Sequence, residues 1–333
     1  MYELSKFYVS TRLTFIAIFF SLWIPQVSYA QVLAAWPNAQ TIRFIVPFTP
    51  GSGTDIIARI LANKLNTSLG TTIVIENKPG AGGTIGAAIV AKANPDGYTF
   101  LIQSSGHVVN PFLYTNLPYD TLKDFVGITP LAQLPNVLVT SPMKGYKGVE
   151  DLVSKAQAEP GTKNYASAGN GSATHMNAEK FRLAAKINAN HIPYKGTPEA
   201  ITDTIAGRVD WFFSPIVSAL PLIKDGKLQP LAVGSNKRSS ALPNVPTTVE
   251  AGVLNSSYIF WVGIFAPAKT PKNIIDKLNE QVLKILKDPE VIAQMNKLGA
   301  EPLLLEPAKF DQMIKSEMDA NAILVKESKM SIN

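Results

Sequence analysis

The chain of 333 residues contains no cysteine and carries 31 Lys and Arg against 25 Asp and Glu, a net charge of +6 at pH 7. The lack of cysteine excludes a disulfide framework and a lipid anchor attached to an N-terminal cysteine. The basic residues are spread along the chain, so no nucleic-acid-binding surface is indicated, although a mild positive field suits anionic ligands. Folding must therefore depend on hydrophobic cores.

Residues 1–30 are typical of a secretory signal peptide. Two basic residues lead into an uncharged stretch at 13–24, and cleavage is predicted after a small-residue pattern, between Ala30 and Gln31. The uncharged stretch is too short to span a bilayer comfortably, so a retained membrane anchor is the less favoured alternative. We expect an exported protein whose remaining 303 of the 333 residues exceed what one core supports, which indicates two lobes.

Strand-like and helix-like segments alternate from residue 42 to about 234. Strands are predicted at 41–48, 72–76, 98–103, 136–140, 164–167, 189–192 and 210–214. Helices are predicted between them at 54–65, 84–93, 149–158, 174–185 and 198–206. This alternation favours an α/β fold with mainly parallel sheets and helices on both faces.

The pattern changes after residue 255. A strand-like run at 258–266 is followed by a helix from Pro271 towards Leu298 and a last helix at about 307–328. A chain that starts one lobe, completes a second and returns to the first would cross over near 128–140 and 256–266. We predict a discontinuous first domain, a second domain inserted into it, and a ligand in the cleft between them. The predicted bounds are 31–132 plus 256–333 for the first domain and 133–255 for the second.

The first glycine-rich turn lies between a strand and a helix, in "IVPFTPGSGTDIIARI". Ser52 is predicted to be the N-cap of the helix, with Asp55 reaching back to the Ser52 amide as in a capping box. Gly51 and Gly53 let a ligand approach the backbone, where free N–H groups and the helix dipole favour an anion. A well-capped helix after a tight turn explains this single motif equally well.

The same strand, turn and helix arrangement recurs twice. Gly82 and Gly83 expose amides before the helix at 84, and the turn after 164–167 ends in Ser172 or Thr174 as a possible cap. Because ligands of α/β sheets lie at the carboxyl ends of strands, we expect the three turns to face one cleft, which favours an anion site. None of the turns contains a dinucleotide fingerprint or a P-loop, so no cofactor is predicted.

Signals for catalysis or metal binding are weak. The three histidines, at 107, 175 and 191, do not pair at metal-ligand spacing, and there is no nucleophile elbow. Asp55 and Asp210 are the carboxylates nearest the predicted cleft, but they lack the context of an acid/base pair. An exported hydrolase or isomerase with a Ser/His or carboxylate pair is the alternative to a binding protein. Among the aromatic residues, Tyr194 is predicted to contact the ligand, whereas Trp211 and Trp261 are predicted to be structural.

Six motifs follow one another along the chain, namely "RFIVPFTPGSGTDIIARILANKL", "IVIENKPGAGGTIGAAIVAKANPDGYTFLI", "YASAGNGSATHMNAE", "IPYKGTPEAITDTIAGRVD", "LPNVPTTVEAG" and "WVGIFAPAKTP". Together and in this order they resemble the Bug family, the periplasmic solute receptors of tripartite tricarboxylate transporters. The resemblance covers about residues 40–330. It implies a periplasmic location and a two-lobed, type II-like periplasmic binding fold that closes on a small organic carboxylate and delivers it to a two-component membrane permease.

The resemblance also implies which residues hold the ligand. The first and third turns hold its carboxylate, and less stereotyped positions meet its far end. Ser52 departs from the usual Pro-Gly-Gly of the first turn. Which carboxylate is bound (di- or tricarboxylate, aromatic acid or acidic amino acid) stays open, as does docking to a membrane sensor instead of a permease. The predicted ligand contacts are Phe48, Pro50, Gly51, Ser52, Gly53, Thr54, Asp55, Ala81, Gly82, Gly83, Ser105, His107, Ser167, Ala168, Gly171, Ser172, Thr174, Tyr194, Thr197 and Asp210, with no catalytic or metal-binding residue.

Overall fold

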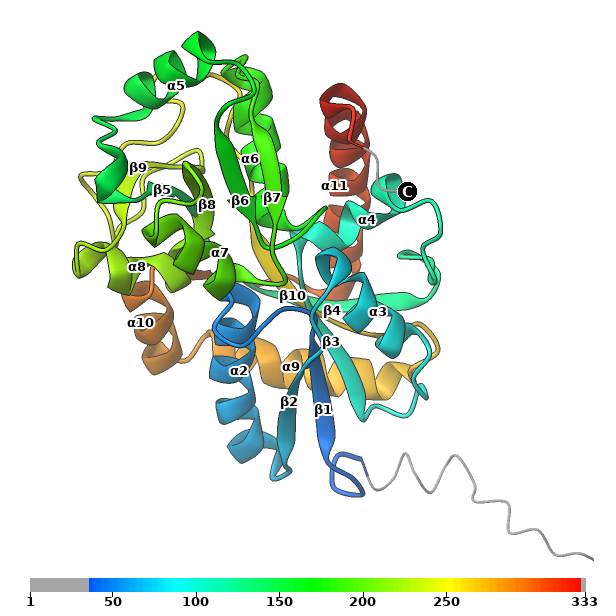
Figure 1. Cartoon of the computed structure of the whole chain (residues 1–333). Helices are drawn as coiled ribbons and strands as arrows, with labels where there is room; N and C mark the ends of the chain where they lie inside the picture. The colour runs from blue at the N-terminus through cyan, green and yellow to red at the C-terminus, as the bar shows by residue number, and fades with distance from the viewer. Residues whose placement is uncertain (1–35, 331–333) are drawn as a thin grey trace, which may run out of the picture.

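The computed structural model describes residues 36–330 and shows two α/β lobes, each built on one sheet (Figure 1). The predicted signal peptide at 1–30 lies outside the described residues. Within 36–330, no helix has the length and apolar character needed to cross a membrane. The two-lobed binding-protein fold that the sequence predicted is confirmed.

The first sheet has six strands in the order β11-β4-β10-β3-β1-β2. β1 pairs in parallel with β2 and β3, whereas β10 runs antiparallel to β3 and β4. The prediction of a mainly parallel sheet is therefore correct only for the first three strands, because β4 leaves the lobe and β10 returns to it in the opposite direction. The strand bounds are β1 Ile42–Val46, β2 Ile73–Asn77, β3 Thr99–Ser104, β4 Phe125–Gln133, β10 Trp261–Pro267 and β11 Glu301–Pro302.

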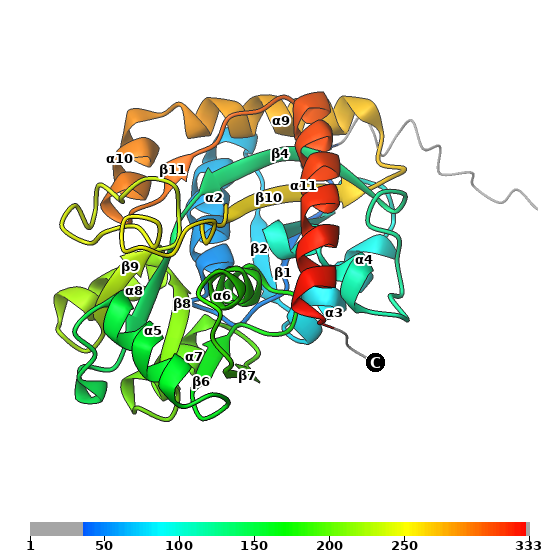
Figure 2. The ribbon, with the colours of Figure 1, turned by 90° about the horizontal axis from the view of Figure 1, so that it is seen from above.

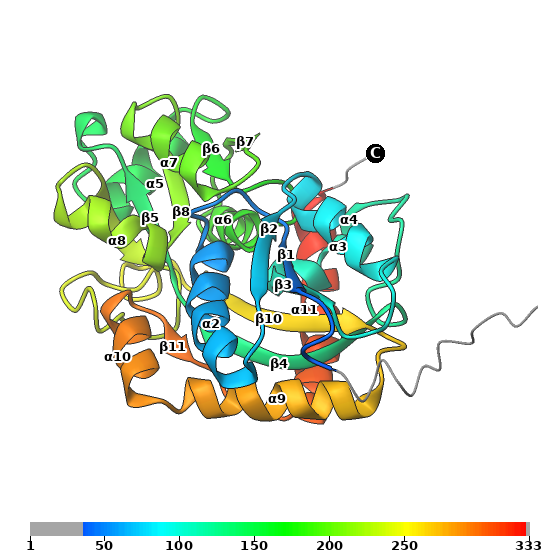
Figure 3. The same ribbon diagram turned by 90° about the horizontal axis from the view of Figure 1, so that it is seen from below.

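Helices cover this sheet, and two of them, α2 and α11, also contact helices of the second lobe. α2 places Ile57, Leu61 and Leu65 on its buried face at helical spacing, and burying each side chain contributes about 1.5–3 kcal/mol. α2 packs on α9, as seen from below (Figure 3). α11 crosses β4 and ends beside α6 of the second lobe (Figure 2). The helix bounds are α2 Gly53–Leu69, α3 Thr84–Ala91, α4 Asn110–Leu113, α9 Lys272–Leu286, α10 Pro289–Lys297 and α11 Pro307–Ser328, with short 3-10 turns η1 Ala81–Gly83 and η2 Ser105–Val108.

The second sheet has five strands in the order β7-β6-β8-β5-β9. β6 pairs in parallel with β7 and β8, while β5 runs antiparallel to β8 and β9. The sequence prediction missed β9 and α8, which contain Pro230 and Pro221, residues that argue against a strand and a helix interior. The bounds are β5 Asn136–Thr140, η3 Pro142–Lys144, α5 Val149–Ala158, β6 Asn164–Ser167, α6 Ala173–Ala184, β7 Asn190–Pro193, α7 Thr197–Ile205, β8 Trp211–Pro215, α8 Ile216–Lys224 and β9 Gln229–Val233.

The chain passes between the lobes twice within the described residues. It leaves the first sheet after β4 and enters the second at β5, and it returns from β9 to β10 through residues 234–260. Both lobes have buried aromatic cores. Trp211 and Trp261 are fully buried, which confirms their predicted structural role.

Candidate functional site

A small cavity lies where the two lobes meet. The first residue of each of three helices lines it, namely Gly53 of α2, Ala173 of α6 and Thr197 of α7. Its volume of about 10 Å³ is only enough for a single water molecule, so the lobes are closed around it. The full lining is Phe48, Ser52, Gly53, Thr54, Ser104, Ala168, Ser172, Ala173, Thr174, Thr197, Pro215 and Phe260.

The first turn is fixed from behind by Asp55. Its carboxylate accepts hydrogen bonds from Arg59 at 2.9 and 3.0 Å, from Asn77 Nδ2 at 2.9 Å and from the Gly51 amide at 2.9 Å. The predicted capping box is therefore wrong, because Arg59 and Asn77 hold Asp55 towards Gly51 instead of Ser52. Burial alone would raise the pKa of Asp55, but these hydrogen bonds lower it below its ordinary value. The carboxylate therefore stays ionised and holds the turn in place.

Ser52 connects the first turn to the second lobe. It is the N-cap residue of α2, but its side chain does not cap that helix. Its Oγ instead accepts a hydrogen bond of 3.1 Å from the Thr197 amide. The approach is so close that a Cβ on Gly196 would lie 1.9 Å from Thr49 Oγ1. The Ser52 hydroxyl is thus a contact between the lobes.

The second turn also meets the second lobe backbone to backbone. Gly82 has a φ of 60°, and a Cβ added there would lie 1.8 Å from the Asn170 carbonyl oxygen. Tyr114 donates a hydrogen bond of 3.2 Å to the same oxygen. A wider groove of about 420 Å³ borders this contact, and we call it the outer groove. It is lined by Ala81, Gly82, Tyr114, Gly169, Asn170, Pro193, Tyr194, Lys195 and Glu199.

The third turn is held by its own hydroxyl groups. Ser172 Oγ accepts from the His175 amide at 3.3 Å, which confirms Ser172 as an N-cap. Thr174 Oγ1 accepts from the Ala168 amide at 2.9 Å and lies 3.0 Å from Ser172 Oγ. These bonds leave the turn in one defined conformation with both hydroxyl groups at the cavity.

Comparison with known proteins identifies the family of this chain. Residues 57–330 match the model of the tripartite tricarboxylate transporter family receptor, TctC. The chain belongs to this family. The BugT protein of Bordetella pertussis is 35% identical over 301 residues, which cover 90% of this chain and 92% of BugT.

Two solved structures of TctC-like receptors from Rhodopseudomonas palustris are close matches. Rpa4515 with adipate has a TM-score of 0.86 and 32% identity, covering 89% of this chain and 100% of that one. MatC with bound malate has a TM-score of 0.82 and 31% identity, covering 86% of this chain and 99% of MatC. These proteins are solute-binding receptors, and the TctC receptor described here is likewise not an enzyme.

A Ser/His pair, Ser167 and His191, is nevertheless present in this TctC receptor. Its contacts support the protein backbone and do not form a catalytic site. Ser167 Oγ lies 2.6 Å from His191 Nε2 and also accepts from the Gly169 amide at 3.0 Å. Ser167 is fully buried and does not line the cavity. Burial, then the neighbouring His175, lowers the pKa of His191 to about 2, so this imidazole stays neutral.

His191 belongs to a stack of rings that we call the aromatic column. It consists of Trp211, Tyr165, His191 and His175, with successive ring centroids 5.7, 5.0 and 3.8 Å apart. His175 Nδ1 accepts from the Gly171 amide at 3.1 Å, so the column ends at the third turn. The column supports the turn from inside the second lobe.

Two predicted ligand contacts lie away from the cavity, each in a structural environment of its own. Asp210 precedes β8 and so lies at the amino end of the strand, where it accepts from Lys144 Nζ at 3.0 Å and the Asn164 amide at 2.8 Å. His107 is buried with its ring centroid 4.8 Å from that of Phe125, and burial lowers its pKa to about 3. Neither residue reaches the cavity.

The other predicted contacts divide into three groups. Phe48, Ser52, Gly53, Thr54, Ala168, Ser172, Thr174 and Thr197 line the cavity. Ala81, Gly82 and Tyr194 line the outer groove. Pro50, Gly51, Asp55, Gly83, Ser105, Ser167 and Gly171 line neither space.

Four cavity residues are absent from the predicted ligand contacts, and one of them, Ala173, lies between the predicted Ser172 and Thr174. Ser104 ends β3 and Pro215 ends β8, so the rule that ligands lie at the carboxyl ends of strands could have found both. Phe260 precedes β10 on the returning crossover, and nothing in its local sequence distinguishes it from a core residue.

Proposed function

We propose that this TctC receptor is a periplasmic protein that captures a small organic carboxylate between its lobes and delivers it to a two-component membrane permease. The observation that carries the proposal is that the N-termini of α2, α6 and α7 meet at one cavity between the lobes. The proposed export signal is residues 1–30. The proposed lobes are 31–132 plus 256–333 and 133–255.

An anion suits this cavity for electrostatic reasons. Each helix N-terminus presents unpaired amides and a partial positive charge, which stabilises a carboxylate by about 0.3–1 kcal/mol per helix. Hydrogen bonds to a charged group contribute about 1.5–3 kcal/mol each. A few such bonds reach the ~8 kcal/mol that micromolar affinity requires. The adipate and malate bound by the R. palustris proteins make a di- or tricarboxylate the first class to test.

Capture requires that the lobes move. A cavity of about 10 Å³ has no room for a carboxylate, so the closed geometry described here must open to admit one. Opening breaks the contact between Ser52 and Thr197 and frees the Thr197 amide for a carboxylate oxygen. Closure around the ligand then makes the form that the permease recognises. The outer groove, with Tyr194 in its wall, is the proposed position for the far end of a longer ligand.

A thermal-shift panel tests the proposal directly. The panel contains adipate, malate, citrate, benzoate, nicotinate and glutamate, with a neutral sugar as control. A ligand at a hundred times its dissociation constant adds about 2.7 kcal/mol of stability, so at least one carboxylate should raise the melting temperature clearly. If the sugar raises it and every carboxylate fails to, the proposed function is wrong.

A further inference from the structure

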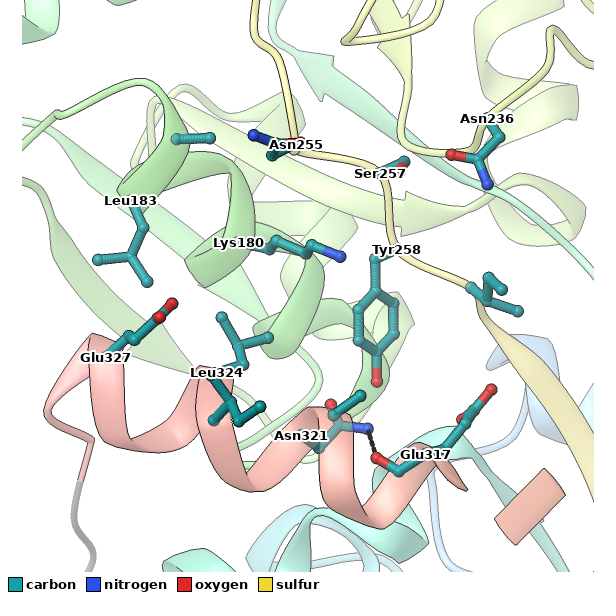
Figure 4. A pocket seen from close by; sticks show the side chains of 14 residues that line it. Lys180, Leu183, Asn236, Asn255, Ser257, Tyr258, Glu317, Asn321, Leu324 and Glu327 are labelled. Atoms are coloured by element: carbon teal, nitrogen blue, oxygen red, sulfur yellow. Dashed lines mark hydrogen bonds between the residues drawn. The ribbon is translucent and has the colours of Figure 1, made fainter. Parts of the chain in front are cut away.

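A second, larger pocket lies away from the cavity, where α6, α11 and residues 255–259 meet (Figure 4). Its volume of about 560 Å³ is in the range of small-molecule sites, which favour interfaces between domains. It shares no lining residue with the cavity or the outer groove, and we call it the Lys180 pocket. It is lined by Lys180, Leu183, Ala184, Asn236, Asn255, Ser257, Tyr258, Ile259, Glu317, Ala320, Asn321, Ile323, Leu324 and Glu327.

Lys180 brings a half-buried positive charge into this pocket. Its side chain leaves α6 and its Nζ points towards Tyr258 (Figure 4). Among residues 36–330, no carboxylate lies within ion-pair distance of this Nζ. Burial lowers the pKa of Lys180, as expected for an ammonium group that has lost water without gaining a counter-charge. The desolvated Lys180 ammonium group can therefore bind an anion in this pocket.

Tyr258 and Glu317 add two polar groups beside this cation. Tyr258 is 7% exposed, and its hydroxyl is buried beside the buried Ser105 hydroxyl. The hydroxyl points towards Glu317 and Asn321 on α11 (Figure 4). Glu317 Oε2 accepts a hydrogen bond of 2.6 Å from Trp261 Nε1, which ties the pocket floor to β10. Tyr258 therefore lines the pocket with its ring, next to the Lys180 ammonium group.

The remaining wall is apolar and partly open to solvent. Leu183 and Leu324 face each other from α6 and α11 in Figure 4. Ile259 and Ile323 at the rim are 46% and 60% exposed, which is unusual for side chains of this size. A second carboxylate would lie against these apolar side chains or near Glu327, so the pocket is suited to one negative charge only.

We infer that the Lys180 pocket is a second ligand site for an amphipathic monocarboxylate. The carboxylate pairs with Lys180 beside the Tyr258 ring, and the apolar chain packs between Leu183 and Leu324. The walls come from both lobes, because α6 belongs to the second lobe and α11 packs on the first sheet. An occupant therefore binds one arrangement of the lobes and is thermodynamically coupled to ligand capture in the cleft.

The test follows binding at the site itself by NMR. Octanoate is titrated into the intact protein and into two variants, Lys180→Met and Lys326→Met, with octanamide as the uncharged probe. The readout is the indole N–H resonance of Trp261, which donates to Glu317 and is assigned with a Glu317→Gln variant. Lys326 is the matched control because it is an exposed lysine of α11 outside the pocket.

Octanoate should shift the Trp261 resonance in the wild type and in Lys326→Met with the same affinity. Because a charge-assisted hydrogen bond is lost, the affinity of Lys180→Met for octanoate should be at least about tenfold lower than that of the wild type. The affinity of the wild type for octanamide should be lower than its affinity for octanoate by a similar factor. Equal affinities for both variants, equal affinities for both probes, or an unmoved Trp261 resonance would each overturn the inference. None of these outcomes tests the proposed function, which is decided separately by the thermal-shift panel.

Discussion

The Ser52 hydroxyl accepts a hydrogen bond from the Thr197 amide at 3.1 Å, although the two residues are 145 positions apart and lie in opposite lobes. Two further bonds accompany it, from Thr49 to Glu199 at 3.0 Å and from Ser218 to the Gly51 carbonyl at 3.1 Å. The first turn is therefore both a part of the proposed carboxylate site and a latch between the lobes. Substitutions at this turn and at its partners can distinguish its role in carboxylate binding from its role in holding the lobes together.

Replacing Ser52 by Ala should shift the lobes towards an open form when no ligand is added. The substitution leaves the buried Thr197 amide without its partner on closure, which costs about 1–3 kcal/mol. Small-angle scattering should show a larger radius of gyration than for the wild type, and a saturating carboxylate should reverse the change by binding this amide. Ser68→Ala, at an exposed position of the same helix, is the control and should scatter like the wild type.

Replacing Gly82 by Ala should block closure. The new Cβ would lie 1.8 Å from the Asn170 carbonyl oxygen, a backbone atom that cannot move alone. Carboxylate affinity measured by calorimetry should fall at least about tenfold, while the protein remains folded. Gly70→Ala is a matched control, because its φ of 62° is close to the 60° of Gly82 and nothing lies within 4 Å of its added Cβ.

Both glycine variants bear the strain of a left-handed alanine, about 1–2 kcal/mol, so their melting temperatures should fall by similar amounts. Only the Gly82 variant should lose the ligand. If Gly70→Ala loses affinity equally, the cause is strain and the second turn has no part in closure.

Replacing Asp55 by Asn should destabilise the first lobe. The change removes a buried carboxylate that holds Arg59, Asn77 and the Gly51 amide, and because the Arg59 side chain left behind is 52% exposed, the cost should be about 1.5–3 kcal/mol. Because these partners lower the pKa of Asp55, their stabilisation is present above its ordinary pKa of about 4 and is lost as the pH falls through the lower folded value. Denaturant unfolding should show a smaller difference in the free energy of unfolding between Asp55→Asn and the wild type at acidic pH than at pH 7. The exposed pair of Asp276 and Lys272, with the same helical spacing, is the control, and Asp276→Asn should change stability little.

Replacing Glu317 by Gln should stabilise the protein at alkaline pH. Burial raises the pKa of Glu317 from 4.5 to about 7, despite the hydrogen bond from Trp261, so the folded state favours the protonated carboxyl group. The folded protein then binds more protons than the unfolded chain between these values, and its stability falls as the pH rises through that window. Glu317→Gln should gain up to about 3 kcal/mol over wild type at pH 8 and little at pH 4. An equal gain at both pH values would mean that the carboxyl group does not titrate as described.

The local parts of the fold and the site were predictable from sequence. Hydrophobic spacing located α2, and a strand followed by a glycine turn and a helix located the first and third turns at the cavity and the second turn at the outer groove. These features depend on residues close together in the chain. Ser172 as the N-cap of α6 is such a case, since its partner is only three residues away.

The failures involve partners that are distant in sequence. Ser52 was expected to cap its own helix, but its real partner is in the other lobe, and Asp55 is held by Asn77 from the end of β2. His107 is enclosed by aromatic rings from β4 and β10, which its neighbours in sequence do not reveal. The antiparallel half of the first sheet likewise depends on a strand that arrives after the whole second lobe.

The aromatic column divides the site into a fixed part and an adaptable part. Because stacked rings and internal hydrogen bonds already determine the third turn, closure moves this turn as a rigid body and the ligand does not have to order it. Little of the binding free energy is then spent on organising the turn. Under the proposed function, substitutions in the outer groove, at positions such as Lys195 and Glu199, should change which far end of a ligand is accepted and leave the proposed carboxylate site unchanged.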